Sequence, residues 1–306
     1  MSEGGDRPVS ASEASTASVG EGRTTDRLGI ALVFVSAVGF GTLGIFGIYA
    51  QRVGLSIPTV LTYRFLVSAV IVWAVLAFSG RFRPLRGRTL AIALALGALG
   101  YATMSGLYFV GLEFMTAGMV GIVLYTYPAL VVVLAAATLD ERITRRTAVA
   151  LVSALGGIAL VIGADPAGAS PTGVVIVLGA AGAYAAYIVT SRAVLETVDP
   201  LVLTAYVLPA GGATFVAISM LTGGVVVPTT FDAWGVLIGV ATIATAVPVL
   251  AFFAGVERIG ASRAGIVSTA EPVVTVILGA ALFAEPVTVA TVGGGACVLL
   301  AVVLLR

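Results

Sequence analysis

A series of long apolar runs limits the folds open to this chain more than any other feature. Each run holds about twenty residues, which at about 1.5 Å of rise per residue matches a hydrocarbon core of about 30 Å. Hydrophobic residues make up 59% of the 306 residues and charged residues only 10%. We predict ten transmembrane helices, near residues 28–49, 57–78, 89–110, 116–138, 146–163, 172–191, 200–221, 233–254, 262–283 and 287–305. The expected fold class is therefore an all-α integral membrane protein.

The residues before the first run have a different composition. Residues 1–27 are rich in Ser, Glu, Gly, Ala and Thr and contain almost no large apolar side chains. Such a segment cannot bury a core, so we expect a disordered tail. The apolar run that begins at Leu28 is too long for a signal peptide, which indicates that it is the first transmembrane helix.

Two parts of the chain resemble each other when one is shifted by 144 positions. Between residues 109–144 and 253–288, 14 of 36 positions are identical. The identical pairs include Gly111/Gly255, Glu113/Glu257, Ala117/Ala261, Pro128/Pro272 and Glu141/Glu285. This similarity predicts two repeats of five helices each, residues 28–163 and 164–306, within one membrane domain.

All 16 basic residues are arginine, and their positions predict the orientation of the chain. With the N-terminus in the cytoplasm, 14 of the 16 fall in cytoplasmic segments, Arg52 lies in an outer loop and Arg64 lies within a span. This distribution follows the positive-inside rule and predicts that both termini are cytoplasmic. Because each repeat has five helices, the second enters the membrane from the opposite side, and the repeats are expected to be inverted.

Composition excludes several classes of function. The chain has no histidine and no lysine, which excludes a histidine metal site, a histidine acid–base catalyst and a lysine Schiff base. The net charge of +1 gives no reason to expect nucleic-acid binding, and one cysteine cannot form an internal disulfide. A membrane-embedded enzyme would need a cluster of reactive side chains at depth, so we predict no catalytic and no metal site. The absence of a P-loop pattern excludes an ATP-driven pump.

Two charged side chains, Arg64 and Glu271, fall within predicted spans. A charge at this depth costs at least about 2.5–3.5 kcal/mol on insertion scales, and such residues normally face a bundle interior or a wet cavity. We therefore propose both as candidates for the substrate site. The alternatives are that Glu271 is protonated and hydrogen-bonds a neighbouring helix, and that Arg64 snorkels outward or bonds a backbone carbonyl.

Pro128 and Pro272 occupy equivalent positions in the fourth and ninth predicted helices. Each removes a backbone N–H, frees the carbonyl of Leu124 or Ser268 one turn earlier, and kinks its helix. Matched kinks in two repeats point to a central binding region, so both prolines are candidate gate elements. Proline is also frequent in transmembrane helices for reasons of packing alone.

Polar and aromatic side chains gather on a few helical faces and complete the list of cavity candidates. These are Tyr101, Ser105, Tyr108, Tyr125, Tyr127, Tyr184, Tyr187, Thr242 and Thr245. Tyr101, Ser105 and Tyr108 follow helical spacing and therefore share one face. A buried tyrosine needs a partner for its hydroxyl, so the face is expected to point inward, either to line a pathway or to join helices.

The duplicated pattern G-x-E…A-x-x-x-G-I-V…P…E, with ten helices in two copies, resembles the EamA-like branch of the drug/metabolite transporter superfamily. The resemblance covers about residues 28–306 and implies a secondary transporter, usually an exporter of amino acids or other small metabolites. It also implies a central cavity formed by helices one to four and six to nine, with helices five and ten at the periphery. Arg64, Pro128 and Pro272 match positions common in relatives, whereas the family pattern requires no acid at Glu271.

We therefore expect an alternating-access transporter of a small-molecule substrate in the plasma membrane, with the lipid bilayer as its surroundings. No cofactor is expected, and proton coupling through Glu271 is a hypothesis. The alternatives are a sugar-phosphate or nucleotide-sugar carrier of the same fold, which would favour several basic residues in the cavity, and a non-transporting membrane protein. The sequence indicates neither the direction of transport nor the oligomeric state.

Overall fold

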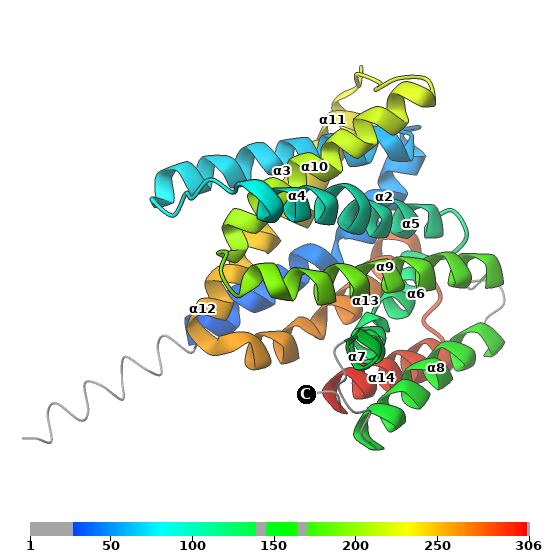
Figure 1. Ribbon diagram of the computed structural model, residues 1–306. Coiled ribbons are helices and arrows are strands. Elements are labelled where there is room, and N and C mark those ends of the chain that lie inside the picture. Colours follow the sequence, from blue (N-terminus) through cyan, green and yellow to red (C-terminus); the bar gives the residue numbers. More distant parts are fainter. Residues whose placement is uncertain (1–26, 139–144, 165–169, 305–306) are drawn as a thin grey trace, which may run out of the picture.

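A computed structural model describes residues 27–138, 145–164 and 170–304. Most of the predicted tail and the predicted loop that contains Glu141 lie outside these ranges. The described chain is helical, with no strand in any of the three ranges. Figure 1 shows the helices packed side by side in one bundle.

The first half of the chain forms five helical stretches. The first is 27–41 with α2 (Leu43–Arg52), and the second is α3 (Ile57–Ser79). The third consists of α4 (Gly87–Ala95), the π-helical η1 (Leu96–Tyr101) and α5 (Ala102–Gly111). The fourth consists of α6 (Ala117–Leu124) and α7 (Tyr127–Thr138), and the fifth is α8 (Arg145–Ala164). Ser56 and Thr116 cap the starts of α3 and α6 through their side-chain oxygens. These caps satisfy backbone N–H groups that have no partner inside the helix.

The second half repeats this order. The sixth stretch is α9 (Pro171–Leu195), and the seventh is α10 (Pro200–Leu221). The eighth consists of α11 (Phe231–Ala241), the π-helical η2 (Thr242–Ala246) and the first part of α12 (Val247–Ser268). The ninth consists of the last part of α12 and α13 (Ala270–Phe283), and the tenth is α14 (Val289–Leu304). The chain reverses inside α12 at Gly260, whose φ of 78° is favourable only for glycine. We number the stretches one to ten in chain order.

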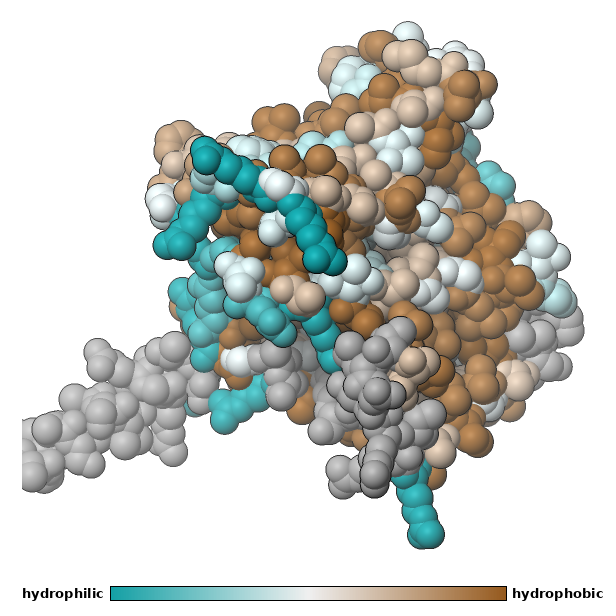
Figure 2. Space-filling model, viewed as in Figure 1, coloured by the Kyte–Doolittle hydropathy of each residue, from teal (hydrophilic) through white to brown (hydrophobic). Residues whose placement is uncertain are grey.

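Eight of the described stretches are long and apolar enough to cross a membrane, and the fifth and tenth contain shorter apolar helices. Their positions agree with the ten predicted helices to within a few residues. Large apolar side chains such as Val70, Leu99 and Met220 are exposed on the outside of the bundle. Figure 2 shows apolar residues over most of the visible face, with hydrophilic side chains gathered mainly at one end. A lipid environment accounts for this surface, because exposed apolar area of this extent is unfavourable in water.

Stretches that are equivalent in the repeat pack against each other. α3 contacts α10, α6 contacts α13, and α8 contacts α14. In Figure 1, α8 and α14 lie together at the edge of the bundle. The contact of α2 with α11 has its counterpart in the contact of α5 with α9. This pattern supports the two-repeat organisation; the opposite orientation of the repeats in the membrane remains a prediction.

Irregularities in the helices also occur at equivalent positions. The α-helix is interrupted at Tyr125 and Thr126 in the fourth stretch and at Thr269 in the ninth, two to three residues before Pro128 and Pro272. The two π-helical segments, η1 and η2, overlap when one is shifted by 144 positions. The predicted kinks are therefore present as breaks, whereas the π-helical segments were not predicted.

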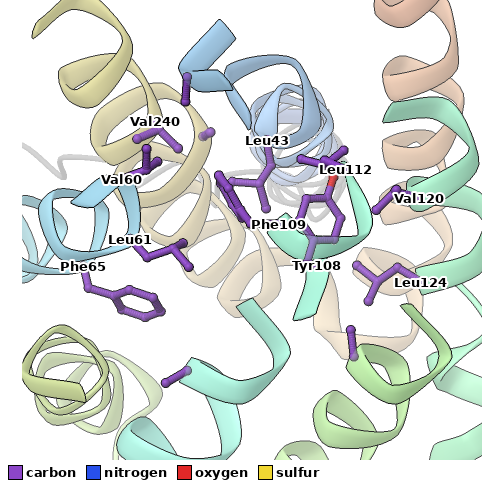
Figure 3. Packing of buried hydrophobic residues seen from close by; sticks show 14 of the residues in the cluster. Leu43, Val60, Leu61, Phe65, Tyr108, Phe109, Leu112, Val120, Leu124 and Val240 are labelled. Carbon is purple, nitrogen blue, oxygen red and sulfur yellow. The ribbon is translucent and has the colours of Figure 1, made fainter. Parts of the chain in front are cut away.

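The main core lies between the stretches and holds the site in place. Figure 3 shows Leu61, Phe65 and Phe109 pointing into the space between neighbouring helices. Small residues let some backbones approach closely: a Cβ atom on Gly97 would meet the carbonyl oxygen of Val207 in α10. These contacts fix the third stretch against the seventh beside the polar residues described next.

Candidate functional site

Arg64 is buried in α3 with 1% of its surface exposed. Its Nε donates to the hydroxyl of Thr245 at 2.9 Å, and its Nη1 donates to the hydroxyl of Ser105 at 3.1 Å. Its Nη2 donates to the hydroxyl of Tyr101 at 3.4 Å. In the described part of the chain no carboxylate lies within ion-pairing distance of Arg64. The guanidinium therefore neither snorkels outward nor bonds a backbone carbonyl; it joins the second stretch to the third and the eighth through neutral hydroxyls.

The two π-helical segments supply two of these three partners. Tyr101 is the last residue of η1 and Thr245 lies in η2. The hydroxyl of Thr245 also donates to the carbonyl of Val240, five residues earlier, at 2.8 Å. Single π-helical turns inside α-helices are frequent at functional sites. Their occurrence on both sides of Arg64 indicates that the local helix geometry is adapted to bind this side chain.

Glu271 lies in the first turn of α13, directly after the break at Thr269. The positive end of a helix favours an acidic side chain at this position. Its Oε2 atom is 3.1 Å from the hydroxyl oxygen of Tyr125, which also lies 2.5 Å from the carbonyl oxygen of Ser268. This is the carbonyl that Pro272 was predicted to free. Glu271 and Arg64 form no ion pair with each other.

A row of tyrosine rings connects the surroundings of Glu271 with those of Arg64. Going from Tyr125 to Tyr101, the ring centroids of successive members are 5.7 Å (Tyr125–Tyr127), 4.6 Å (Tyr127–Tyr184), 6.1 Å (Tyr184–Tyr187) and 5.6 Å (Tyr187–Tyr101) apart. Tyr125 contacts Glu271 and Tyr101 contacts Arg64 through their hydroxyls. We call these five residues the tyrosine row. It combines side chains from the third, fourth and sixth stretches.

Two candidates, both among the described residues, make no hydrogen bond to Arg64 or Glu271, although Tyr108 lies within electrostatic range of both. The Thr242 hydroxyl donates to the carbonyl of Ile238 in its own helix and is partly exposed, so it makes no contact with Arg64. Tyr108 is buried beside Gly44, and no hydrogen bond to Arg64 is recorded for it. Ser105 and Tyr108 are buried and Tyr101 is partly buried, in keeping with one inward face, but helical periodicity alone could not show which of them hydrogen-bond Arg64.

Glu285 forms a contact that was not predicted from the sequence. Its carboxylate accepts hydrogen bonds from the backbone N–H groups of Ala117 at 2.9 Å and Gly118 at 3.1 Å. It thereby ties the segment after α13 to the first turn of α6. A carboxylate is stabilising at such a helix start. The identity of Glu141 and Glu285 in the repeat was a signal for a structural role at this position.

Two apolar grooves run along the sides of the site. One, of about 330 Å³, lies between α6, α13 and α14 and is lined by Tyr125, Pro272 and Val276 among others. The other, of about 290 Å³, lies between the third and sixth stretches and is lined by Leu96, Tyr187 and other residues. Each groove has one member of the tyrosine row in its wall.

Comparison with known proteins agrees with this architecture. The sequence profile of the EamA-like transporter family matches residues 27–163 and again residues 171–306. The chain is 25% identical over 270 residues to a Bacillus subtilis (strain 168) protein named uncharacterized transporter YcbK, covering 84% of this chain and 86% of that one. It is 28% identical over 278 residues to an uncharacterized transporter of Archaeoglobus fulgidus, covering 91% and 96%. A crystal structure with 20% sequence identity has the same fold, with a TM-score of 0.63 over 90% of this chain and 95% of that chain.

Proposed function

The chain belongs to the EamA-like transporter family, and from that premise we propose that it exports amino acids or other small metabolites by alternating access. Its general role is that of a multi-pass membrane transporter, and relatives across most of its length carry the name of transporters. The proposal adds the direction, the class of substrate, secondary active transport and a location in the plasma membrane.

The observation that carries the proposal is the placement of Arg64 and Glu271 at the two ends of the tyrosine row. A guanidinium held by neutral hydroxyls keeps its positive charge, and a movement of the helices that exposes it would let it bind a substrate carboxylate. A carboxylate at the other end can bind an amine, and tyrosine faces attract cations. This pairing of a cation with an anion would favour a zwitterionic or cationic metabolite as the substrate.

Glu271 is the proposed proton carrier. It is the only acidic residue within the two halves of the broken ninth stretch, and its carboxylate lies among tyrosines. Uptake of a proton from one side of the membrane and its release on the other would drive export if substrate and proton compete for this carboxylate. The transporter would then exchange protons for substrate.

The alternative of a sugar-phosphate or nucleotide-sugar carrier has less support. Phosphate groups are usually bound by several arginine or lysine side chains. Arg64 is the only buried basic residue in the described part of the chain.

Two measurements test the proposal. A thermal-shift screen of the purified protein against amino acids, polyamines, sugars and nucleotides should find ligands among the zwitterions or amines, because a ligand that binds only the folded state raises its stability. Liposomes containing the protein should then accumulate that ligand against its gradient when a pH gradient is imposed. Glu271→Gln keeps the size of the side chain but cannot ionise, so it should abolish this accumulation. Accumulation by Glu271→Gln at the wild-type level would show that the carboxylate does not couple transport to protons.

A further inference from the structure

We propose that the hydroxyl of Tyr125 links the proton on Glu271 to the shape of the break in the ninth stretch. Tyr125 is thus a positioning residue for the proton step, and this inference rests on the proposed role of Glu271 as the proton carrier. Three groups meet at the break: the side chain of Tyr125 from the fourth stretch, the carbonyl of Ser268 at the end of α12, and the carboxyl of Glu271 at the start of α13.

The number of protons available at this junction determines its hydrogen bonds. The hydroxyl oxygen of Tyr125 is 2.5 Å from the carbonyl oxygen of Ser268 and 3.1 Å from Oε2 of Glu271. A phenol has one hydrogen to donate, and a carbonyl oxygen can only accept. If Tyr125 donates to Ser268, its contact with Glu271 is a hydrogen bond only when Glu271 carries a proton and donates it to Tyr125. Both contacts can therefore be hydrogen bonds at the same time only in the protonated form of Glu271.

Loss of that proton changes the preferred partner of Tyr125. A carboxylate only accepts, and hydrogen bonds to a charged acceptor are stronger than those to a neutral carbonyl. The hydroxyl then turns towards Glu271, and the carbonyl of Ser268 loses its donor. Pro272 has no N–H to replace it, and a carbonyl without a partner is unfavourable within a membrane. The deprotonated form therefore favours a different angle between α12 and α13, in which this carbonyl finds another donor.

The hydroxyl of Tyr125 is a direct partner of Glu271, and other titratable groups lie around the carboxyl. α13 packs against α6 and α2. The titratable residues of α2, Tyr49 and Arg52, both contact Phe283 at the far end of α13. Tyr108 from the third stretch and Tyr184 from the sixth lie within electrostatic range of Glu271, and the ring of Tyr127 packs against those of Tyr125 and Tyr184.

The break in the fourth stretch lacks this device, although it occupies the equivalent position. The residues that correspond to Tyr125 and Glu271 under the shift of 144 are Thr269 and Tyr127. The Thr269 hydroxyl donates to the carbonyl of Ile266 in its own helix instead of crossing to the other repeat. Only the ninth stretch is therefore expected to respond to the proton.

The test measures the shape of the break directly, without substrate. In a Cys297→Ala background, cysteines at Ile266 and Phe78 would carry spin labels on exposed sites of the ninth and second stretches. Pulsed electron paramagnetic resonance in lipid nanodiscs then gives the distance between the labels in acidic and alkaline buffer. Infrared difference spectra of the same samples follow the protonated carboxyl of Glu271.

We expect the wild-type distance to shift with pH together with the carboxyl band. Tyr125→Phe should give one distance at every pH while the carboxyl band still titrates. Glu271→Gln should keep the acidic-form distance throughout. Tyr63→Phe, a matched loss of one hydroxyl from a ring that packs against Trp234, should behave as wild type.

A pH-dependent shift in Tyr125→Phe equal to that of wild type would overturn the inference, as would a wild-type distance that does not change with pH. If Tyr125→Phe fails to fold, Glu271→Gln decides the matter, since a wild-type shift in that variant contradicts the link equally. The proposed function is tested separately. It fails if Glu271→Gln in liposomes still accumulates substrate when a pH gradient is imposed.

Discussion

The guanidinium of Arg64 meets neutral oxygen atoms from two other helical stretches and, in the part of the chain that the structure describes, no carboxylate. A hydrogen bond to a charged group contributes about 1.5–3 kcal/mol, so the three contacts together offset much of the cost of burying the charge. Within the described part of the chain no anion neutralises it, so the charge inside the bundle is uncompensated. The fixed fork of arginine donors explains how one side chain reaches three acceptors in different directions.

Arg64→Lys keeps the charge but replaces the fork by a single ammonium group, which cannot reach all three hydroxyls. We expect substrate affinity to fall by about tenfold or more, which corresponds to about 1.4 kcal/mol or more. Transport and ligand binding by the reconstituted protein check this. Arg52→Lys, at an arginine over the ring of Phe283 near the end of the first stretch, is the control and should change affinity little. Equal affinity in Arg64→Lys and wild type would exclude a role in binding.

Thr245 and Thr242 form a matched pair within η2. Thr245→Val removes an acceptor of Arg64 and leaves Nε buried without a partner, which should cost about 1–3 kcal/mol of stability. Thr242→Val removes a hydroxyl that bonds only its own helix, and its cost should stay below about 1 kcal/mol. Thermal unfolding of the two variants in detergent measures the difference. A similar loss in both would mean that the contact with Arg64 contributes little to stability.

Among the helical elements, the fourth and ninth stretches each combine a break in the helix with candidate site residues. A break before a proline divides a helix into two parts that can change their angle without unwinding the rest. The breaks at Tyr125 and Thr269 occupy equivalent positions, and both adjoin the tyrosine row or Glu271. Alternating access requires movement of this kind near the substrate.

Pro128→Ala and Pro272→Ala should each impair transport while the protein remains in the membrane. Alanine restores an N–H that can bond the carbonyl one turn earlier, which straightens the helix; at Ser268 it also competes with Tyr125. Transport in liposomes and protein abundance in membranes are the two measurements. Pro209→Ala is the control, because Pro209 lies inside α10 and has no proline at the equivalent position of the first repeat. Wild-type transport by both variants would make the breaks details of packing.

The sequence was sufficient to predict the spans and the two breaks, because apolar length and proline chemistry act locally. The π-helical segments could not be predicted, since no local pattern in the sequence marks them, and the contact of η2 with Arg64 joins residues 181 positions apart. The same holds for the tyrosine row: helical spacing places Tyr184 and Tyr187 near one face, but only packing of the sixth stretch against the fourth brings Tyr184 to Tyr127.

At the scale of the whole molecule, polar contacts tie helix ends together at several places. Arg81, after α3, forms ion pairs with Asp199 at the start of α10 at 2.5 Å and with Glu257 in α12 at 2.6 Å. Glu285 joins the segment after α13 to α6. The ion pairs are substantially exposed, so each contributes only about 0–1 kcal/mol and can break during a transport cycle.

The orientation predicted from arginine positions can be tested with fusions to a reporter that is active only outside the cytoplasm. Fusions at Arg83 and Arg263 should be silent, and a fusion at Gly224 should be active, because arginine-rich segments are retained in the cytoplasm. An active fusion at Arg83 would reverse the orientation of the whole chain.

The hydrogen bond between Arg64 and Thr245 can form only after the eighth stretch has been synthesised. The acceptor follows the donor by 181 residues, which at about 5–20 residues per second takes roughly 10–40 s to translate. During that interval the second stretch is in or near the membrane, and its charged side chain, Arg64, lacks Thr245 as a partner. A nascent chain that stalls before the eighth stretch is therefore an exposed intermediate, and the cell's insertion and quality-control machinery has this interval in which to shield it or degrade it.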